Sequence, residues 1–326
     1  MRRRTVIAAA AGAMAVSPRT VLAQSAAMPT IGFLTTSTEE QTRPHVAAFR
    51  RGLKETGFVE GNNVLIEFRR AEGEYQRLPA MAAEFARRPV SLIVAQAPPA
   101  ALAAKSATST IPIVFVVGID PIGSGLVSSL SRPGGNATGM TLMSAALAQK
   151  RLEMLRELSP KAKVIAMLVN PVSPDADLEV TLVRAAAQSL ELQLTTFEVR
   201  DTDGMPDAFA AIAGGRPDAL LVGTDSFLQI RRQDVATRAL ALKVPAIYPF
   251  RNYAEAGGLM SYGTSIPNAY RQAGIYAGRI LKGERPENLS VIEPISFEMV
   301  INLKAASALG LDIPASMHVR ADEVIE

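Results

Sequence analysis

The stretch IPIVFVVGIDPIGSGLVSSLSRPGGNATG, residues 111–139, contains the features that decide the fold. It begins with an apolar run typical of a buried strand and breaks at Asp120-Pro121. Residues 123–130 then predict a short helix, and residues 133–136 predict a turn. Two explanations fit a buried strand that ends at a carboxylate: a nucleotide-binding loop, or the rim of a cleft between two lobes.

Apolar and amphipathic runs alternate on both sides of this stretch. Before it we expect strands at 30–36, 63–71, 90–96 and 112–118, and helices at 44–58, 78–88 and 98–108. After it we expect helices at 144–158, 175–190, 205–213 and 228–242, and strands at 163–171, 192–199, 218–225 and 244–250. This order predicts two α/β units, each a parallel sheet covered by helices on both faces, with a turn-rich join at 133–140.

The C-terminal part is too small for a third domain. It predicts strands at 257–263 and 295–303, a helix at 267–283 and a short closing helix at 304–311. We expect these pieces to complete the first two units, with the chain crossing back and forth.

The first 23 residues have the layout of a secretory signal peptide. Three arginines at positions 2–4 precede a short apolar run, and Ala23 offers a small residue before a cut, with Ala27 as an alternative. The apolar run is too short to span a bilayer. General secretion and the twin-arginine route both fit, so we expect export to the periplasm.

Composition excludes several classes of function for the mature chain. Residues 1–23 hold four of the 34 basic residues and no acidic residue, which leaves 30 basic and 31 acidic residues and a formal charge of −1. A basic face for nucleic acid is therefore not expected. The sequence has no cysteine, which rules out a disulfide, a thiol nucleophile and a lipid-carrying cysteine.

Ligands of parallel α/β sheets bind at the carboxyl ends of the strands, so these ends supply the candidate site. The candidate ligand-binding residues are Thr36, Ser37, Gln96, Ala97 and Asp120 in the first unit, and Asn170, Asp225, Tyr248 and Tyr262 in the second. Hydroxyls and main-chain N–H groups suit a carboxylate, Asp120 or Asp225 suits an ammonium, and the tyrosines suit an apolar or aromatic side chain. Each Ser, Thr or Asp has the alternative role of a helix cap.

Catalytic and cofactor motifs are incomplete. Gly123-x-Gly125 is not followed by the Gly-Lys-Ser/Thr of a phosphate loop and lacks the third glycine of a dinucleotide site. His45 and His318 are far apart in the sequence and have no recognisable partners for a metal site or a catalytic triad. Residues 201–207 lack the ligands of a calcium loop. We therefore expect a protein that is not an enzyme and uses no cofactor or metal.

Three segments together resemble a known family. Residues 118–139, the run GGLMSYG at 257–263 and the ending LGLDIPASMHVRADEVIE at 309–326 are similar to substrate-binding proteins of ABC transporters, whose characterised members include tryptophan- and tyrosine-type binders. The resemblance covers nearly all of the mature chain. The sequence differs from the family pattern at Ile119, where a Gly-Asp pair is usual, and at residues 96–98, where a hydroxyl-containing loop is common.

The resemblance implies a two-lobed, type I periplasmic-binding-protein fold of class α/β, with three crossings between the lobes. Lobe I would comprise 28–140 and 263–290, and lobe II 141–262 and 291–326. A monomer would capture a small-molecule ligand, an amino acid or an aromatic or aliphatic carboxylate, and deliver it to an ABC permease with its ATPase. Asp120 would stand on the lobe I rim. Two alternatives remain: a ligand-sensing module for a signalling receptor, and an exported enzyme on the same fold.

Overall fold

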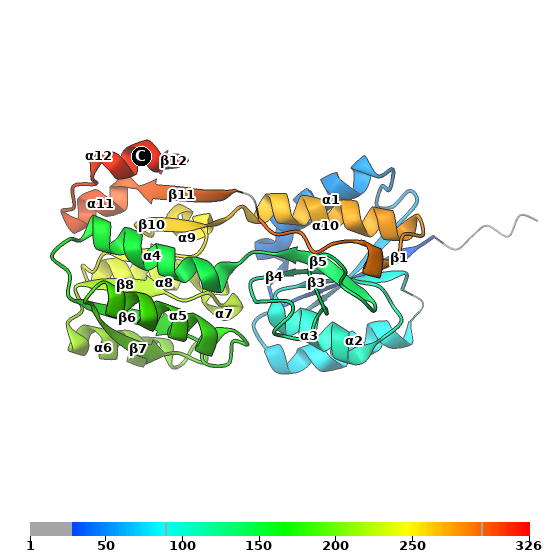
Figure 1. Cartoon of the computed structure of the whole chain (residues 1–326), viewed down its shortest axis with the longest axis horizontal. Coiled ribbons are helices and arrows are strands. Elements are labelled where there is room, and N and C mark those ends of the chain that lie inside the picture. Colours follow the sequence, from blue (N-terminus) through cyan, green and yellow to red (C-terminus); the bar gives the residue numbers. More distant parts are fainter. Residues whose placement is uncertain (1–27, 89, 295) are drawn as a thin grey trace, which may run out of the picture.

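The computed structural model describes residues 28–88, 90–294 and 296–326, in which the strands form two sheets, one in each lobe (Figure 1). The predicted signal peptide lies outside these described residues. The strands of lobe I are β1 (Thr30–Thr35), β2 (Leu65–Arg70), β3 (Leu92–Gln96), β4 (Ile113–Val117) and β5 (Ala137–Thr141). They are all parallel and lie in the order β2-β1-β3-β4-β5.

Helices cover both faces of this sheet. They are α1 (Glu39–Glu55), α2 (Leu78–Arg87), α3 (Pro98–Ala107) and α10 (Ile266–Leu281), with two short 3-10 helices, η1 (Tyr75–Arg77) and η2 (Pro286–Asn288). The pair α2 and α3 packs together, and α10 lies against α1 although the two are far apart in the sequence (Figure 1).

Lobe II is built in the same way. Its strands are β6 (Val164–Val169), β7 (Gln193–Glu198), β8 (Ala219–Val222), β9 (Ala246–Tyr248), β10 (Met260–Thr264), β11 (Phe297–Asn302) and β12 (Glu323–Ile325). Its helices are α4 (Ser144–Leu158), α5 (Ala176–Ser189), α6 (Met205–Gly215), α7 (Ser226–Ile230), α8 (Arg232–Ala241), α9 (Arg251–Glu255), α11 (Leu303–Leu309) and α12 (Ala315–Arg320). The sheet order is β12-β11-β10-β9-β8-β6-β7, and only the β10–β11 pair is antiparallel. The expected α/β class with two mostly parallel sheets is confirmed.

The central strands β3 and β4 are continuous apolar runs because the sheet buries both of their faces. In β4, Val114 and Val116 enter the core layer that α1 and α10 cover, whereas Ile113, Phe115 and Val117 enter the layer under α2 and α3. This alternation follows from the two-residue period of a strand. The opening stretch of the sequence therefore holds together both helix layers of lobe I.

The chain passes between the lobes through short segments. It leaves lobe I after β5, returns after β10 to form α10, and enters lobe II again between η2 and β11. Among the described residues, none of the helices has the length and apolarity that a bilayer span requires.

Several sequence expectations were wrong in detail. Residues 121–136 form turns instead of a short helix, because their glycines and prolines favour turns, and the join at 133–140 contains β5. The helix expected at 228–242 is divided at Arg231 into α7 and α8. Helix α1 begins five residues before the predicted start, where Thr38 and Gln41 form a capping box. The short elements α9, α12 and β12 were not predicted.

Helices α1 and α10 approach so closely that glycine is required at their contact. A Cβ atom on Gly274 would lie 2.1 Å from the Phe49 carbonyl oxygen. We expect Gly274→Ala to lower the free energy of unfolding by about 1–3 kcal/mol, because the backbones must move apart. Gly214→Ala in α6, where an added Cβ meets nothing within 4 Å, is the control and should be neutral or stabilising. Chemical denaturation of both variants measures the difference, and equal stabilities would contradict the packing argument.

Candidate functional site

The carboxyl ends of strands from both lobes surround a cavity of about 780 Å³, counting the part that is open to solvent. Lobe I contributes residues that follow β1, β3 and β4, and lobe II contributes residues that follow β6, β8 and β9. The cavity thus has the position of a ligand site between two α/β sheets.

The order of the lobe I strands changes direction between β1 and β3, and polar side chains meet there. The Thr35 hydroxyl donates to Gln96 Oε1, and Gln96 Nε2 donates to Ser37 Oγ over 3.3 Å. Ser37 and Gln96 both line the cavity. The lobe I floor therefore presents a hydroxyl and an amide that are already fixed by each other.

The wall beside Gln96 offers few hydrogen-bond donors. Ala97 donates its N–H to the Val116 carbonyl over 2.9 Å, and α3 then begins with Pro98 and Pro99, which have no N–H. Ala97, Pro98 and Pro99 all line the cavity. The start of α3, whose free N–H groups would otherwise suit an anion, is an apolar surface here.

An imidazole and a phenol form one side of the cavity. His45 of α1 stacks on Tyr270 of α10, with ring centroids 4.8 Å apart and planes at 6°. Burial, with a smaller contribution from the charge of Arg232, lowers the pKa of His45 to about 4. The imidazole is therefore neutral at neutral pH, and this stack gives the cavity a flat, uncharged surface.

Asp225 caps α7 and also joins the two lobes. Its Oδ1 accepts from the Leu228 N–H at 3.0 Å and from Asn170 Nδ2 at 3.1 Å. Its Oδ2 accepts from the Tyr75 hydroxyl of lobe I at 3.0 Å, and that hydroxyl accepts from the Phe227 N–H at 2.8 Å. A further inter-lobe bond runs from Gln41 Nε2 to the Ile230 carbonyl at 3.0 Å. The lobes are thus in direct contact at one edge of the cavity.

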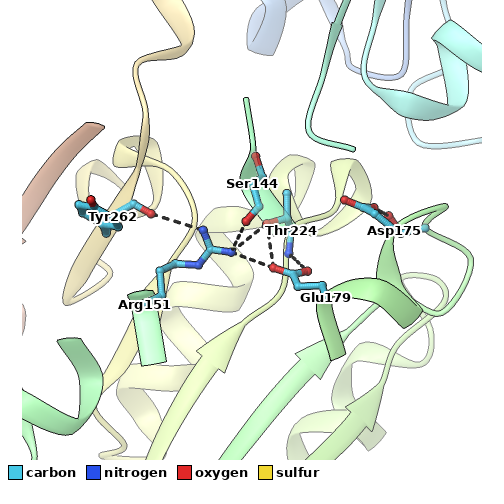
Figure 2. Close-up of polar contacts among 7 residues, drawn as sticks. Ser144, Arg151, Asp175, Glu179, Thr224 and Tyr262 are labelled. Carbon is cyan, nitrogen blue, oxygen red and sulfur yellow. Dashed lines mark hydrogen bonds and ion pairs between the residues drawn. The ribbon is translucent and has the colours of Figure 1, made fainter. Parts of the chain in front are cut away.

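A buried ion pair lies beneath the lobe II side of the cavity (Figure 2). Arg151 Nη2 donates to Glu179 Oε1 at 2.8 Å, to the Ser144 carbonyl at 3.0 Å and to Thr224 Oγ1 at 3.1 Å. Glu179 Oε2 accepts from the Thr224 N–H at 2.8 Å. Burial raises the pKa of Glu179 to about 7, and the Arg151 charge opposes that rise. The guanidinium also reaches the Tyr262 carbonyl, so one side chain connects cavity-lining Thr224 to residues beside two crossings.

Two other charged groups of lobe II line the cavity. Asp175 precedes α5, is 4% exposed and accepts from Ser173 Oγ at 2.6 Å. Burial is the main cause that raises the pKa of its carboxyl. Arg232 at the start of α8 donates from Nη1 to the Gln229 carbonyl, and no carboxylate in the described part of the chain forms an ion pair with it. The carboxylate of Asp175 and the guanidinium of Arg232 are therefore both placed to bind charged groups of a ligand.

Four of the nine candidate residues line the cavity: Ser37, Gln96, Ala97 and Asp225. Asn170 lies behind Asp225 and orients its carboxylate. Thr36 is fully buried outside the lining, where its carbonyl accepts from the Gly73 N–H. Both oxygens of Asp225 already accept hydrogen bonds within the protein, and its ammonium-binding role stays a prediction.

The three remaining candidates lie away from the cavity lining. Asp120 is exposed, and its carboxylate accepts from the Ile122 and Gly123 N–H groups at 2.9 and 3.0 Å, which makes it a turn cap. Tyr248 is 1% exposed and stacks on Tyr253 inside lobe II. Tyr262 packs near the Phe297 ring, because β10 pairs with β11.

Sequence reasoning missed Asp175 and Arg232, and it gave His45 no role in a ligand site. Asp175 had a signal, since it follows the end of β6 by six residues, but an aspartate before a predicted helix is usually a cap. His45 lies inside α1 and Arg232 begins α8, so neither residue follows a strand directly. Only the packing of the two lobes brings them to the cavity.

Comparisons with known proteins agree with this architecture. The model of one protein family, described as ABC transporter substrate binding protein, matches residues 39–325. The tyrosine-binding protein of Clostridioides difficile (strain R20291) is 27% identical over 278 residues, which cover 84% of this chain and 80% of that protein.

Two crystal structures are each 28% identical to the chain. A conserved domain protein from Vibrio cholerae has a TM-score of 0.85, with 91% of this chain and 99% of that chain covered. An ABC domain from Streptococcus pneumonia in complex with L-Trp has a TM-score of 0.81, with 90% and 100% covered. The likeness thus extends over both lobes.

Proposed function

The chain belongs to the family of ABC transporter substrate binding proteins, and we propose that it is the exported receptor of an ABC importer. It captures a small molecule, an amino acid or an aromatic or aliphatic carboxylate, in the cleft between its lobes. The lobes close over the ligand by a hinge motion, and the closed monomer delivers it in the periplasm to a membrane permease with its ATPase. The protein binds its ligand without converting it.

One observation carries this proposal: a cavity whose walls come from two lobes that also hydrogen-bond to each other. Tyr75 of lobe I meets Asp225 and Phe227 of lobe II, and Gln41 meets Ile230. Such bonds exist only when the cleft is closed. A ligand that contacts both walls selects this state, since it binds the closed form better than the open one.

The ligand class is supported by the relatives and by the charges of the cavity. One relative is described as a tyrosine-binding protein, and a similar structure contains L-Trp. Arg232, which forms no ion pair with a carboxylate among the described residues, offers its guanidinium to a carboxylate. The His45–Tyr270 stack offers a flat surface to an apolar or aromatic body.

A thermal-shift screen of the mature protein tests the proposal. The panel contains aromatic and aliphatic amino acids and matching carboxylic acids. A ligand at a hundredfold excess over its Kd stabilises the native state by about 2.7 kcal/mol, which raises the melting temperature. If no compound of the panel changed the melting temperature, the result would contradict the proposed ligand class. Recovery of the bound ligand unchanged after incubation distinguishes binding from turnover.

We expect Arg232→Gln to weaken the binding of the carboxylate ligand by about 10- to 100-fold, because a charged hydrogen bond contributes about 1.5–3 kcal/mol. Arg231→Gln is the matched control, since Arg231 is the adjacent and exposed arginine. Calorimetric titration measures both affinities. Equal affinities in the two variants would remove Arg232 from the binding site.

Export and delivery have their own tests. The mature N-terminus should begin at Gln24 if the signal peptide is cut after Ala23. Cells that lack the protein should lose uptake of the ligand identified by the screen, and the gene should restore it. Normal uptake together with loss of a ligand-dependent transcriptional response would instead favour a sensory role.

A further inference from the structure

Asp175 occupies the position of a helix cap but does not act as one. It is the N-cap residue of α5, yet its side chain makes no hydrogen bond to the backbone at the start of the helix. One oxygen accepts from Ser173 Oγ at 2.6 Å. The other oxygen, Oδ2, is buried and has no hydrogen-bond partner among the described residues. The usual reason for an aspartate at this position is therefore absent.

A buried carboxylate oxygen without a donor is unfavourable, because burial removes the hydrogen bonds that water would supply. Asp175 is 96% buried, being 4% exposed, and it lines the cleft. Such a group in a native protein calls for a partner that binds there. In a cleft that takes up small molecules, the partner is a donor on the ligand.

The other buried acids around the cleft cannot serve this purpose. Glu179 accepts from Arg151 and from the Thr224 N–H and hydroxyl. Asp225 accepts from Tyr75, Asn170 and Leu228. Asp175 stands to one side of the Arg151 network (Figure 2) and retains a free oxygen. It is thus the carboxylate that has capacity for a ligand.

Two side-chain amides of lobe II add to this capacity. Gln229 Oε1 and Asn252 Oδ1 also line the cleft and have no partner in the described part of the chain. Because an amide can exchange the positions of its oxygen and nitrogen, these two groups do not fix the polarity of the ligand. The carboxylate of Asp175 does fix it, since an ionised carboxylate only accepts.

On the lobe I side, the start of α3 gives no counterpart for a second anion. Pro98 and Pro99 have no N–H, and the Ala97 N–H is bound to Val116. A ligand with a carboxylate alone would meet Arg232 but would leave Asp175 unpaired. A ligand with both a carboxylate and an ammonium satisfies both charges.

We infer that Asp175 binds a protonated amine and restricts the ligand to amino acids, excluding carboxylic acids that lack the amine. This inference rests on the proposed function and narrows the ligand class of the same cleft. The ammonium donates to Asp175 Oδ2, while the carboxylate pairs with Arg232. Asp175 is therefore the residue that determines specificity between the two ligand types.

Pairs of ligands that differ only in the amine test the inference. Tryptophan is compared with indole-3-propionate, tyrosine with 3-(4-hydroxyphenyl)propionate, and leucine with 4-methylpentanoate, each by calorimetric titration. The chain contains no tryptophan, so the fluorescence of bound tryptophan gives an independent reading. We expect the amino acid of the binding pair to bind about 10- to 100-fold more tightly than its partner.

In the variant Asp175→Asn, the two members of a ligand pair should have dissociation constants within a fewfold of each other, because the amide keeps the shape of the side chain but loses its charge. Its melting temperature without ligand should not fall, since an unpaired buried charge is removed. Asp177→Asn removes an exposed acid from the first turn of the same helix and should leave the preference unchanged.

The outcomes separate the inference from the proposed function. Equal binding of both members of a pair to the unmodified protein would overturn the inference and leave a carboxylate receptor in place. An undiminished preference in Asp175→Asn would also overturn it, because another group would then select the amine. A panel in which neither member of any pair binds would overturn both.

Discussion

Replacing Glu179 with alanine should lower the free energy of unfolding by about 3–5 kcal/mol, because it leaves a buried charge without its partner. Arg151 is 0% exposed, and Glu179 is the carboxylate that pairs with it at 2.8 Å. Without that carboxylate, the guanidinium keeps only the carbonyl and hydroxyl contacts to Ser144, Tyr262 and Thr224. Chemical denaturation of the ligand-free protein measures the loss.

Two controls test whether the loss of stability comes from the burial of the Arg151 charge or from the removal of any ion pair. Glu153→Ala removes the acid of an exposed pair with Lys150 on α4 and should change stability by less than about 1 kcal/mol. The double variant Arg151→Met with Glu179→Met removes both charges and should recover most of the stability that Glu179→Ala loses. A Glu179→Ala protein as stable as Glu153→Ala would show that water reaches the guanidinium.

Replacing Tyr75 with phenylalanine should weaken ligand binding by about tenfold or more. The hydroxyl joins the lobes through Asp225 Oδ2 and the Phe227 N–H, and hydrogen bonds to charged groups contribute about 1.5–3 kcal/mol. In the open state water forms hydrogen bonds with the Tyr75 hydroxyl, Asp225 and the Phe227 N–H. Removing the hydroxyl therefore destabilises the closed state and not the open one. The apparent Kd rises in proportion as the closed fraction falls.

Calorimetry measures the affinity of Tyr75→Phe, and small-angle scattering of the ligand-free protein reports the degree of closure. Tyr276→Phe is the control, because that hydroxyl donates to the Ser290 carbonyl and does not bridge the cleft. We expect the Tyr75 variant to be more extended than the control without ligand and equally compact with saturating ligand. Unchanged affinity and shape would show that the Tyr75 contacts do not hold the lobes together.

Much of the fold was predictable because central strands such as β3, β4 and β8 are buried on both faces and therefore read as unbroken apolar runs. The helix predicted at 144–158 matches α4 at both ends, since its leucines recur with the helical period. Strand β5, with the sequence ATGMT, lacks such a run and follows a glycine-rich turn, so it was assigned to the join. Because residues 121–136 are rich in turn-forming residues, the boundary between the turns and β5 could not be predicted from the sequence.

The site was less predictable because a strand end gives a position but not the direction of its side chain. Asp120 and Asp225 both end apolar runs, yet backbone N–H groups occupy the first carboxylate and an inter-lobe contact occupies the second. Asp175 carries the free oxygen, although the sequence presents it as a cap. Hydrogen-bond partners, which depend on the packed structure, decide among the three.

The position of α10 in the chain has a consequence for synthesis. Arg271 on α10 bonds to Glu55 on α1, a residue 216 positions earlier. At about 5–20 residues per second, the ribosome needs roughly 10–45 s to make the segment between them. Throughout that interval the apolar face of α1 has no covering helix, even after residue 141, where the last of the five strands of its own sheet ends. A prematurely terminated chain that lacks α10 therefore exposes this face and is a substrate for chaperones and proteases, even if it contains most of lobe II.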